Sequence, residues 1–235
     1  MKSVYLLLLI PFLQSCENPP MAQTGAYDES MMMKVSDTTA SNPLNPYDSA
    51  GEIHDEILAA YMSAPVLPST LQGILASVDS IAQLNSRFIG AKSTGFSALT
   101  TQQASGILND SDAVATAIAN AGISSTARAR LEDFADGYFL YCATSDDFGG
   151  LYDYIVDFED TILASSALST TDKRSVLTVT SIVRHSQFRR RRPKKNRDLD
   201  WEVNMFHLAG AIEGSPTCSA SAVSRALSLG IAENR

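Results

Sequence analysis

Residues 124–142, which read SSTARARLEDFADGYFLYC, decide the fold that the sequence predicts. Their apolar residues recur every three or four positions, the spacing that places side chains on one face of an α-helix. The residues on that face are Leu131, Phe134, Ala135, Tyr138 and Cys142. Ser124 or Ser125 precedes the first turn, where a serine hydroxyl accepts a hydrogen bond from an unpaired backbone amide. We therefore expect a long amphipathic helix.

The same spacing recurs on both sides of this stretch. Upstream, Pro65 and Pro68 separate two such faces, which consist of Ile53, Ile57, Leu58 and Tyr61, and of Leu71, Ile74, Leu75, Val78 and Ala82. Downstream, further faces consist of Leu151, Ile155, Phe158 and Ile162, of Leu208 and Ile212, and of Val223, Leu227 and Ile231. The β-branched run from Val176 to Val183 suits a strand as well as a helix. About eight amphipathic segments with short connections predict an all-α fold, an irregular multi-helix bundle.

The start of the chain has the composition of a secretory signal. Met1-Lys2-Ser3 supplies one basic residue, and Val4 to Phe12 is an uncharged apolar run. That run is shorter than the ~20 residues that a membrane-spanning helix needs. The composition therefore favours a cleaved signal over a permanent anchor.

The next residues, Leu13-Gln14-Ser15-Cys16, resemble the lipobox of bacterial lipoproteins. The resemblance implies that the thiol of Cys16 receives a diacylglycerol group and that the chain is cut before Cys16. It also implies that the new amine is acylated, with a fatty acid such as palmitate. Gln14 departs from the small or apolar residue usual at that position. The alternative is an ordinary secretory signal in which Cys16 has no role.

These signals predict a signal peptide (1–15), a lipidated flexible tether (16–46) and a single helical domain (47–235). The tether is rich in Pro, Asn, Ser, Thr and Met and has neither helical nor strand periodicity. With 45% hydrophobic residues, the chain is able to bury a core. We expect the protein in the cell envelope, with a membrane as partner through the lipid and an envelope protein as a second partner.

Lipidation of Cys16 leaves Cys142 and Cys218 for other roles. Outside the cytoplasm two thiols are able to form a disulfide, but two cysteines alone do not define a disulfide framework. A Cys142–Cys218 bridge and two independent thiols are therefore both open alternatives.

Positive charge is concentrated in one segment of an otherwise acidic chain. Eight of the 18 basic residues lie between Arg184 and Arg197, while all 26 acidic residues lie elsewhere. The candidate anion-binding residues are Arg189, Arg190, Arg191, Arg192, Lys194, Lys195 and Arg197. Pro193 indicates a loop, near residues 188–197, that is either simply solvated or in contact with phosphate or anionic lipid. Nucleic acid is not an expected partner because the acidic remainder of the chain repels it.

The strongest candidate for metal or acid–base chemistry is His54, beside Glu52, Asp55 and Glu56. No second histidine stands three or four positions away on the same helix face, so a partner would have to be His185 or His207. A place in the first turns of a helix, where negative charge suits the helix dipole, explains these acids without a ligand. We therefore assign no catalytic residue, no metal ligand and no cofactor.

A second acidic group follows later in the chain and consists of Asp146, Asp147, Asp153, Asp157, Glu159 and Asp160. It lacks the alternating spacing and the central glycine of an EF-hand loop. We expect a solvated helix face here rather than a calcium site. The chain also has no Gly-x-Ser-x-Gly nucleophile elbow, P-loop or dinucleotide-binding fingerprint.

A second resemblance rests on Asn45-Pro46-Tyr47-Asp48, followed by Gly51 and by His54-Asp55-Glu56. This order is similar to the opening of a group of short bacterial lipoproteins, which read Asn-Pro-Tyr-Asp, then Gly, then His-Asn-Glu. Ala209 to Gly214 resembles a small-residue segment near the end of the same proteins. The resemblance implies a lipid-anchored helical protein and transfers no catalytic residue. From the residues themselves, we expect Asp48 or Ser49 to cap the helix that follows.

Together these observations favour a membrane-anchored envelope lipoprotein, a non-enzymatic interaction or accessory module. One alternative is a metal-dependent or hydrolytic enzyme centred on His54. Another is a polyanion-binding module that uses residues 189–197.

Overall fold

The computed structural model describes residues 39–190 and 205–234. The chain divides into Met1–Ser36 and Asp37–Arg235, and every described residue belongs to the second unit. Over the described ranges all regular elements are helices, ten in number, and there is no strand. The all-α prediction is confirmed, with somewhat more helices than the eight expected.

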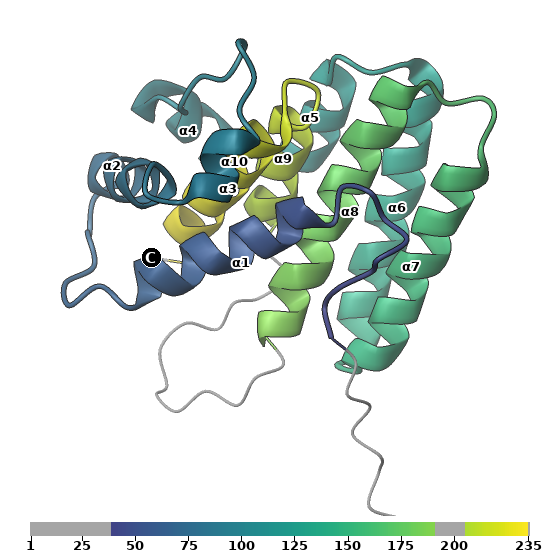
Figure 1. The fold of residues 1–235 in the computed structure, drawn as a ribbon, viewed down its shortest axis with the longest axis horizontal. Coiled ribbons are helices and arrows are strands. Elements are labelled where there is room, and N and C mark those ends of the chain that lie inside the picture. Colours follow the sequence, from purple (N-terminus) through teal and green to yellow (C-terminus); the bar gives the residue numbers. More distant parts are fainter. Residues whose placement is uncertain (1–38, 191–204, 235) are drawn as a thin grey trace, which may run out of the picture. The chain divides into compact units, whose positions relative to one another are not determined.

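The helices follow one another in the chain as shown in Figure 1. Their bounds are α1 (Ser49–Met62), α2 (Leu71–Ala82), α3 (Ser86–Gly90), α4 (Thr101–Leu108), α5 (Ala113–Asn120), α6 (Ser125–Thr144), α7 (Phe148–Ala164), α8 (Thr170–Arg190), α9 (Met205–Gly214) and α10 (Ser219–Glu233).

Polar side chains begin several of these helices, and at α6 this residue is the serine that the sequence predicted. Ser124 precedes α6, and its hydroxyl accepts a hydrogen bond from the amide of Ala127 at 3.2 Å. At the start of α8, Ser169 and Asp172 form reciprocal hydrogen bonds. The amide of Asp172 donates to the Ser169 hydroxyl, and the amide of Ser169 donates to the Asp172 carboxylate. Such reciprocal bonds satisfy amides that have no partner within the helix.

The predicted apolar faces form the core. On α6, Leu131, Phe134, Ala135 and Tyr138 are buried, and Cys142 is half-buried at the end of the stripe. On α1 the whole predicted face, from Ile53 to Tyr61, is buried. The helical spacing of apolar residues therefore identified the surfaces that pack together.

Helix α8 is the central element of the described unit. It packs against α1, α6, α7, α9 and α10, and in Figure 1 it runs between α6 and α7 on one side and α1, α9 and α10 on the other. All residues from Ser175 to His185 are buried. Because this part of α8 has no solvent-facing side, it has no polar face and no amphipathic period, which is why Val176 to Val183 also suited a strand.

Helices α9 and α10 approach each other closely at two glycines. A Cβ at Gly210 would lie 2.6 Å from the backbone oxygen of Arg225, and one at Gly214 would lie 2.4 Å from the backbone carbon of Ser221. The two glycines are four residues apart on α9, and their lack of a side chain permits contact between the backbones of α9 and α10.

Residues 40–46, which the sequence assigned to the tether, are part of the folded unit. Ala40, Asn42 and Asn45 are each at least nine-tenths buried. The segment is polar and has no helical period, but its amides bond to groups inside the protein. The polar residues of this segment therefore form buried hydrogen bonds. The folded part of the chain begins before residue 47.

Candidate functional site

The most unusual group in the interior is the guanidinium of Arg184, on the central helix α8. Its side chain is fully buried, with 0% of its surface exposed. Nη2 donates to Asp48 Oδ1 at 2.6 Å and to Glu159 Oε1 at 3.2 Å, while Nη1 donates to the backbone oxygen of Ala40. A buried cation is tolerated only when opposite charges and hydrogen bonds compensate its lost hydration. Here two carboxylates supply that compensation.

Glu159, on α7, is equally buried. Besides Arg184, it accepts hydrogen bonds from Asn42 Nδ2 at 2.6 Å, Asn45 Nδ2 at 2.9 Å and Thr180 Oγ1 at 2.8 Å. The expectation of a solvated acidic face is therefore wrong for Glu159, because its carboxylate faces the Arg184 cation inside the protein. The other five acids of that group are exposed.

Asp48 completes this charge cluster at the start of α1. It is the N-cap residue, yet its side chain makes no capping bond. The carboxylate instead accepts from Ser41 Oγ at 2.9 Å and from Ser181 Oγ at 3.2 Å, in addition to Arg184. The capping prediction for Asp48 is wrong because buried donors, above all the Arg184 guanidinium, take the carboxylate. Burial alone would raise the pKa of Asp48, but His185 and Arg184 hold that pKa far below its ordinary value.

We call these residues the buried polar cluster: Asn42, Asn45, Asp48, Glu159, Thr180, Ser181 and Arg184. The cluster joins residues 40–48 to α7 and α8. Its members hydrogen-bond one another over large sequence separations, up to 136 residues between Arg184 and Asp48. It therefore fixes the beginning of the folded unit to the central helix.

All three histidines of the chain lie beside this cluster in the interior. His54 on α1 is 1% exposed and His207 on α9 is 4% exposed. Their Nε2 atoms are 2.9 Å apart, and the rings are nearly perpendicular, at 81°. His185 on α8 is also buried, with its Nε2 3.4 Å from Asp48 Oδ1. The sequence named His185 and His207 as the available partners of His54, and the fold brings His207 to it.

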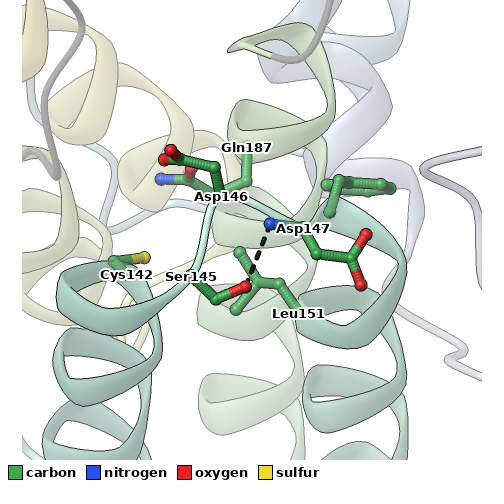
Figure 2. A pocket seen from close by; sticks show the side chains of 7 residues that line it. Cys142, Ser145, Asp146, Asp147, Leu151 and Gln187 are labelled. Carbon is green, nitrogen blue, oxygen red and sulfur yellow. Dashed lines mark hydrogen bonds between the residues drawn. The ribbon is translucent and has the colours of Figure 1, made fainter. Parts of the chain in front are cut away.

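Two pockets are described elsewhere in the part of the chain that the structure covers. The pocket shown in Figure 2 lies between α6, α7 and α8, has a volume of about 180 Å³, and is lined by Cys142, Ser145, Asp146, Asp147, Phe148, Leu151 and Gln187. A wider pocket of about 420 Å³ lies between α5 and α6, with Met205 of α9 at its edge. Neither is lined by a histidine. His54 and His207 are 1% and 4% exposed, so little of either residue meets solvent.

Several polar groups around the smaller pocket are engaged in holding the fold. The Asp147 carboxylate accepts from the amides of Gly149 at 3.1 Å and Gly150 at 2.9 Å, which caps α7. The dashed bond in Figure 2 runs from the Asp147 amide to the Ser145 hydroxyl, at 3.1 Å. Gln187 donates to the hydroxyl of Tyr138. Ser145, Asp147 and Gln187 therefore stabilise the helix ends and contacts around this pocket.

Some of the sequence-predicted site residues are placed by the structure. Cys142 and Cys218 are not joined in a disulfide; Cys142 is half-buried near the end of α6, and Cys218 is buried, with its Sγ 3.3 Å from Ser221 Oγ. Among the described residues no group of three or more His, Cys, Asp or Glu is arranged to hold a metal ion.

The basic segment begins within α8 rather than in a loop, since Phe188, Arg189 and Arg190 belong to its last turn. Arg189 forms an ion pair with Asp55 of α1, and its Nη2 donates to the Asp55 backbone oxygen at 2.9 Å. Arg189, one of the candidate anion-binding residues, is therefore already paired with a carboxylate of the same chain. The side chain of Arg190, the residues Arg191, Arg192, Lys194, Lys195 and Arg197, and Cys16 lie outside the described residues.

Comparison with known proteins gives no relative: no family model, curated protein or solved structure matches the chain. No helix in the described ranges is long and apolar enough to cross a membrane.

Proposed function

We propose that this protein is a lipid-anchored component of the bacterial cell envelope whose helical body is a non-enzymatic interaction or accessory module. The observation that carries this proposal is Leu13-Gln14-Ser15-Cys16 directly after an apolar run of signal length. The resemblance of residues 45–56 to the opening of bacterial lipoproteins points the same way.

The interior of the helical body supports the non-enzymatic part of the proposal. The Asp48 and Glu159 carboxylates neutralise Arg184, and His54 and His207 bind each other. General acid–base catalysis needs a group within hydrogen-bond reach of a substrate. His54 is 1% exposed, so we regard an enzyme centred on it as the weaker alternative.

The buried polar cluster gives an anchored protein a fixed junction. Two acyl chains hold a protein stably on a membrane, whereas one gives only marginal binding. The chain between Cys16 and the body would transmit any displacement to residues 40–48. Those residues are bonded to Glu159 on α7 and Arg184 on α8, inside the core. Such a junction suits a body that must remain folded at a surface.

Metabolic labelling with an alkyne analogue of palmitate tests the anchor. We expect the wild-type protein to be labelled and to fractionate with membranes, because Cys16 carries the lipid. Cys16→Ala should lose the label completely and should keep its uncleaved signal. Cys142→Ala and Cys218→Ala are matched controls, and both should be labelled like the wild type. Equal labelling of Cys16→Ala and wild type, or no labelling of either, would contradict the proposal.

A second candidate function, binding of an anionic surface, is favoured by one observation on α8. Arg184, which holds Ala40 at the start of the folded unit, is six residues before Arg190, where the run of basic residues continues. Six helical residues span roughly 9 Å. The Ala40 contact and the last described turn of α8 are therefore close together, and we propose that the basic residues after this turn contact anionic lipid.

Sedimentation with vesicles that contain anionic phospholipid tests this candidate. Each basic residue near an anionic surface contributes about 1 kcal/mol, so changing Arg190, Arg191 and Arg192 to Ser should weaken binding roughly a hundredfold. Binding should also weaken as salt is raised. Changing Arg128 and Arg130 of α6 to Ser provides the control and should leave binding nearly unchanged. Unaltered binding of the triple variant would eliminate this function.

A further inference from the structure

The pocket between α6, α7 and α8 contains a hydrogen-bond acceptor that the fold does not use (Figure 2). Gln187 of α8 is 9% exposed, and its Nε2 donates to the hydroxyl of Tyr138. No group in the described part of the chain donates to its Oε1, and Gln187 lines the pocket. Polar atoms of nearly buried side chains normally have a partner. Here a donor can reach the oxygen from the pocket.

The connection between α6 and α7 adds two further acceptors to this pocket. The Asp146 carboxylate makes no hydrogen bond or ion pair with the described residues. The Ser145 hydroxyl accepts from the amide of Asp147 at 3.1 Å and has a second lone pair. Phe148 and Leu151 add apolar walls. The pocket therefore combines three acceptors with a surface on which a short carbon chain can pack.

The charges around the pocket favour a cationic ligand. Residues 131–164, which include most of α6 and all of α7, contain nine acidic residues and no lysine or arginine. The residues that line the pocket include two acids and no basic residue. On α8, Arg184 precedes Gln187 and Arg189 follows it, and both arginines are paired with carboxylates outside the pocket. A positively charged donor would therefore be attracted to the pocket.

We propose that this pocket binds the ammonium group of a small primary amine. A primary ammonium has three N–H donors, which match the Asp146 carboxylate, Gln187 Oε1 and Ser145 Oγ. The pocket volume of about 180 Å³ corresponds to roughly six water molecules of ~30 Å³ each, which limits the ligand to a few heavy atoms. Free alkylamines and the ethanolamine headgroup of phospholipids both carry this group. The site belongs to the helical body and does not depend on lipid attachment at Cys16.

Titration of the full chain with ethanolamine, followed by nuclear magnetic resonance, tests the site. We expect saturable shifts of the backbone amide signals of residues 145–151 and of the side-chain amide of Gln187. Choline should bind at least about tenfold more weakly, because its quaternary nitrogen has no N–H donor. Glycerophosphoethanolamine, a water-soluble form of the headgroup, distinguishes the two sources. An affinity at least equal to that of ethanolamine would assign the site to the lipid headgroup, and a lower affinity would assign it to a free amine.

A pair of variants locates the binding on the Asp146 carboxylate. Asp146→Asn should weaken the binding of ethanolamine at least about tenfold, because it removes a charged hydrogen bond. Asp160→Asn is the matched control: it removes an exposed carboxylate near the other end of α7 and should keep the wild-type affinity. Three results would overturn the proposal: no shift on addition of ethanolamine, equal affinities for ethanolamine and choline, or an Asp146→Asn variant that binds like the wild type.

Discussion

Arg184→Met is expected to lower the free energy of unfolding by about 3–5 kcal/mol, the cost of leaving a buried charge without its partner. The methionine fills much of the volume but removes the cation that faces Asp48 and Glu159. Both carboxylates are at the centre of the buried polar cluster, and Glu159 has no exposed surface. Without Arg184, Glu159 would be an uncompensated buried charge or would have to take up a proton. Urea denaturation followed by circular dichroism measures this loss.

Two further variants separate the ion pair from simple loss of packing. Arg130→Met on α6 removes an exposed arginine that lies 3.7 Å from Asp133, and should change the stability by less than about 0.5 kcal/mol. Replacing Glu159 with Gln in the Arg184→Met background removes the orphaned charge and should recover part of the loss. Equal, small effects of Arg184→Met and Arg130→Met would show that the cluster does not support the fold.

Gly214→Ala should cost about 3 kcal/mol, at the upper end of the cost of overpacking. The new methyl group would lie 2.4 Å from the backbone carbon and oxygen of Ser221 and 2.5 Å from the amide nitrogen of Ala222. These are backbone atoms of α10, so no side-chain rotation relieves the overlap. Helices α9 and α10 would have to move apart, which would open the core around them. Thermal and urea unfolding both measure the effect.

Gly106→Ala is the control for this change. It makes the same substitution inside α4, where a Cβ would have no atom within 4 Å. Alanine restricts the unfolded chain and favours helix, so this variant should gain roughly 0.5–1 kcal/mol. Opposite signs for the two glycine variants would establish that backbone contact, and not helix propensity, explains Gly214. A neutral Gly214→Ala would contradict the close packing of α9 on α10.

Helix faces were predictable from the sequence because one side of each helix meets water. The stripe from Leu131 to Tyr138 on α6 and the face from Ile53 to Tyr61 on α1 both alternate with polar residues at helical spacing. Capping by Ser124 was predictable for the same reason, since it depends on residues three positions apart. In contrast, α8 is buried on all sides from Ser175 to His185, so its pattern does not distinguish helix from strand.

The charge and histidine contacts of the interior were not predictable in this way. Glu159 lies among exposed acids. It falls on the buried helix face of Ile155 and Ile162, but that spacing does not identify the buried cation that its carboxylate meets. Its partners are determined by the packing of α7 against α8 and by the position of residues 42–45, which precede it by 114 residues or more. His54 and His207 are 153 residues apart. One sequence signal did exist, namely a single arginine, Arg184, within an otherwise uncharged run from Ser175 to Ser186 that also contains His185.

In the segment from Asn42 to Asp48, the sequence predicted the start of a helix correctly but assigned the wrong role to the side chains. The sequence marked Asn45 and Asp48 as the entry to a helix, and α1 does begin at Ser49. Their side chains, however, face inward to Glu159 and Arg184. Caps and buried ion pairs use the same residue types, so the local pattern alone does not separate them.

Mass spectrometry of the mature N-terminus is the most direct test of the proposed function. The protein is purified from the membrane fraction and digested, and the first peptide is sequenced in the gas phase. We expect a peptide that begins at Cys16 and carries a diacylglycerol group on its sulfur, with or without an acyl chain on its amine. A mature chain that begins at any other residue, or a Cys16 without lipid, would contradict the proposed function.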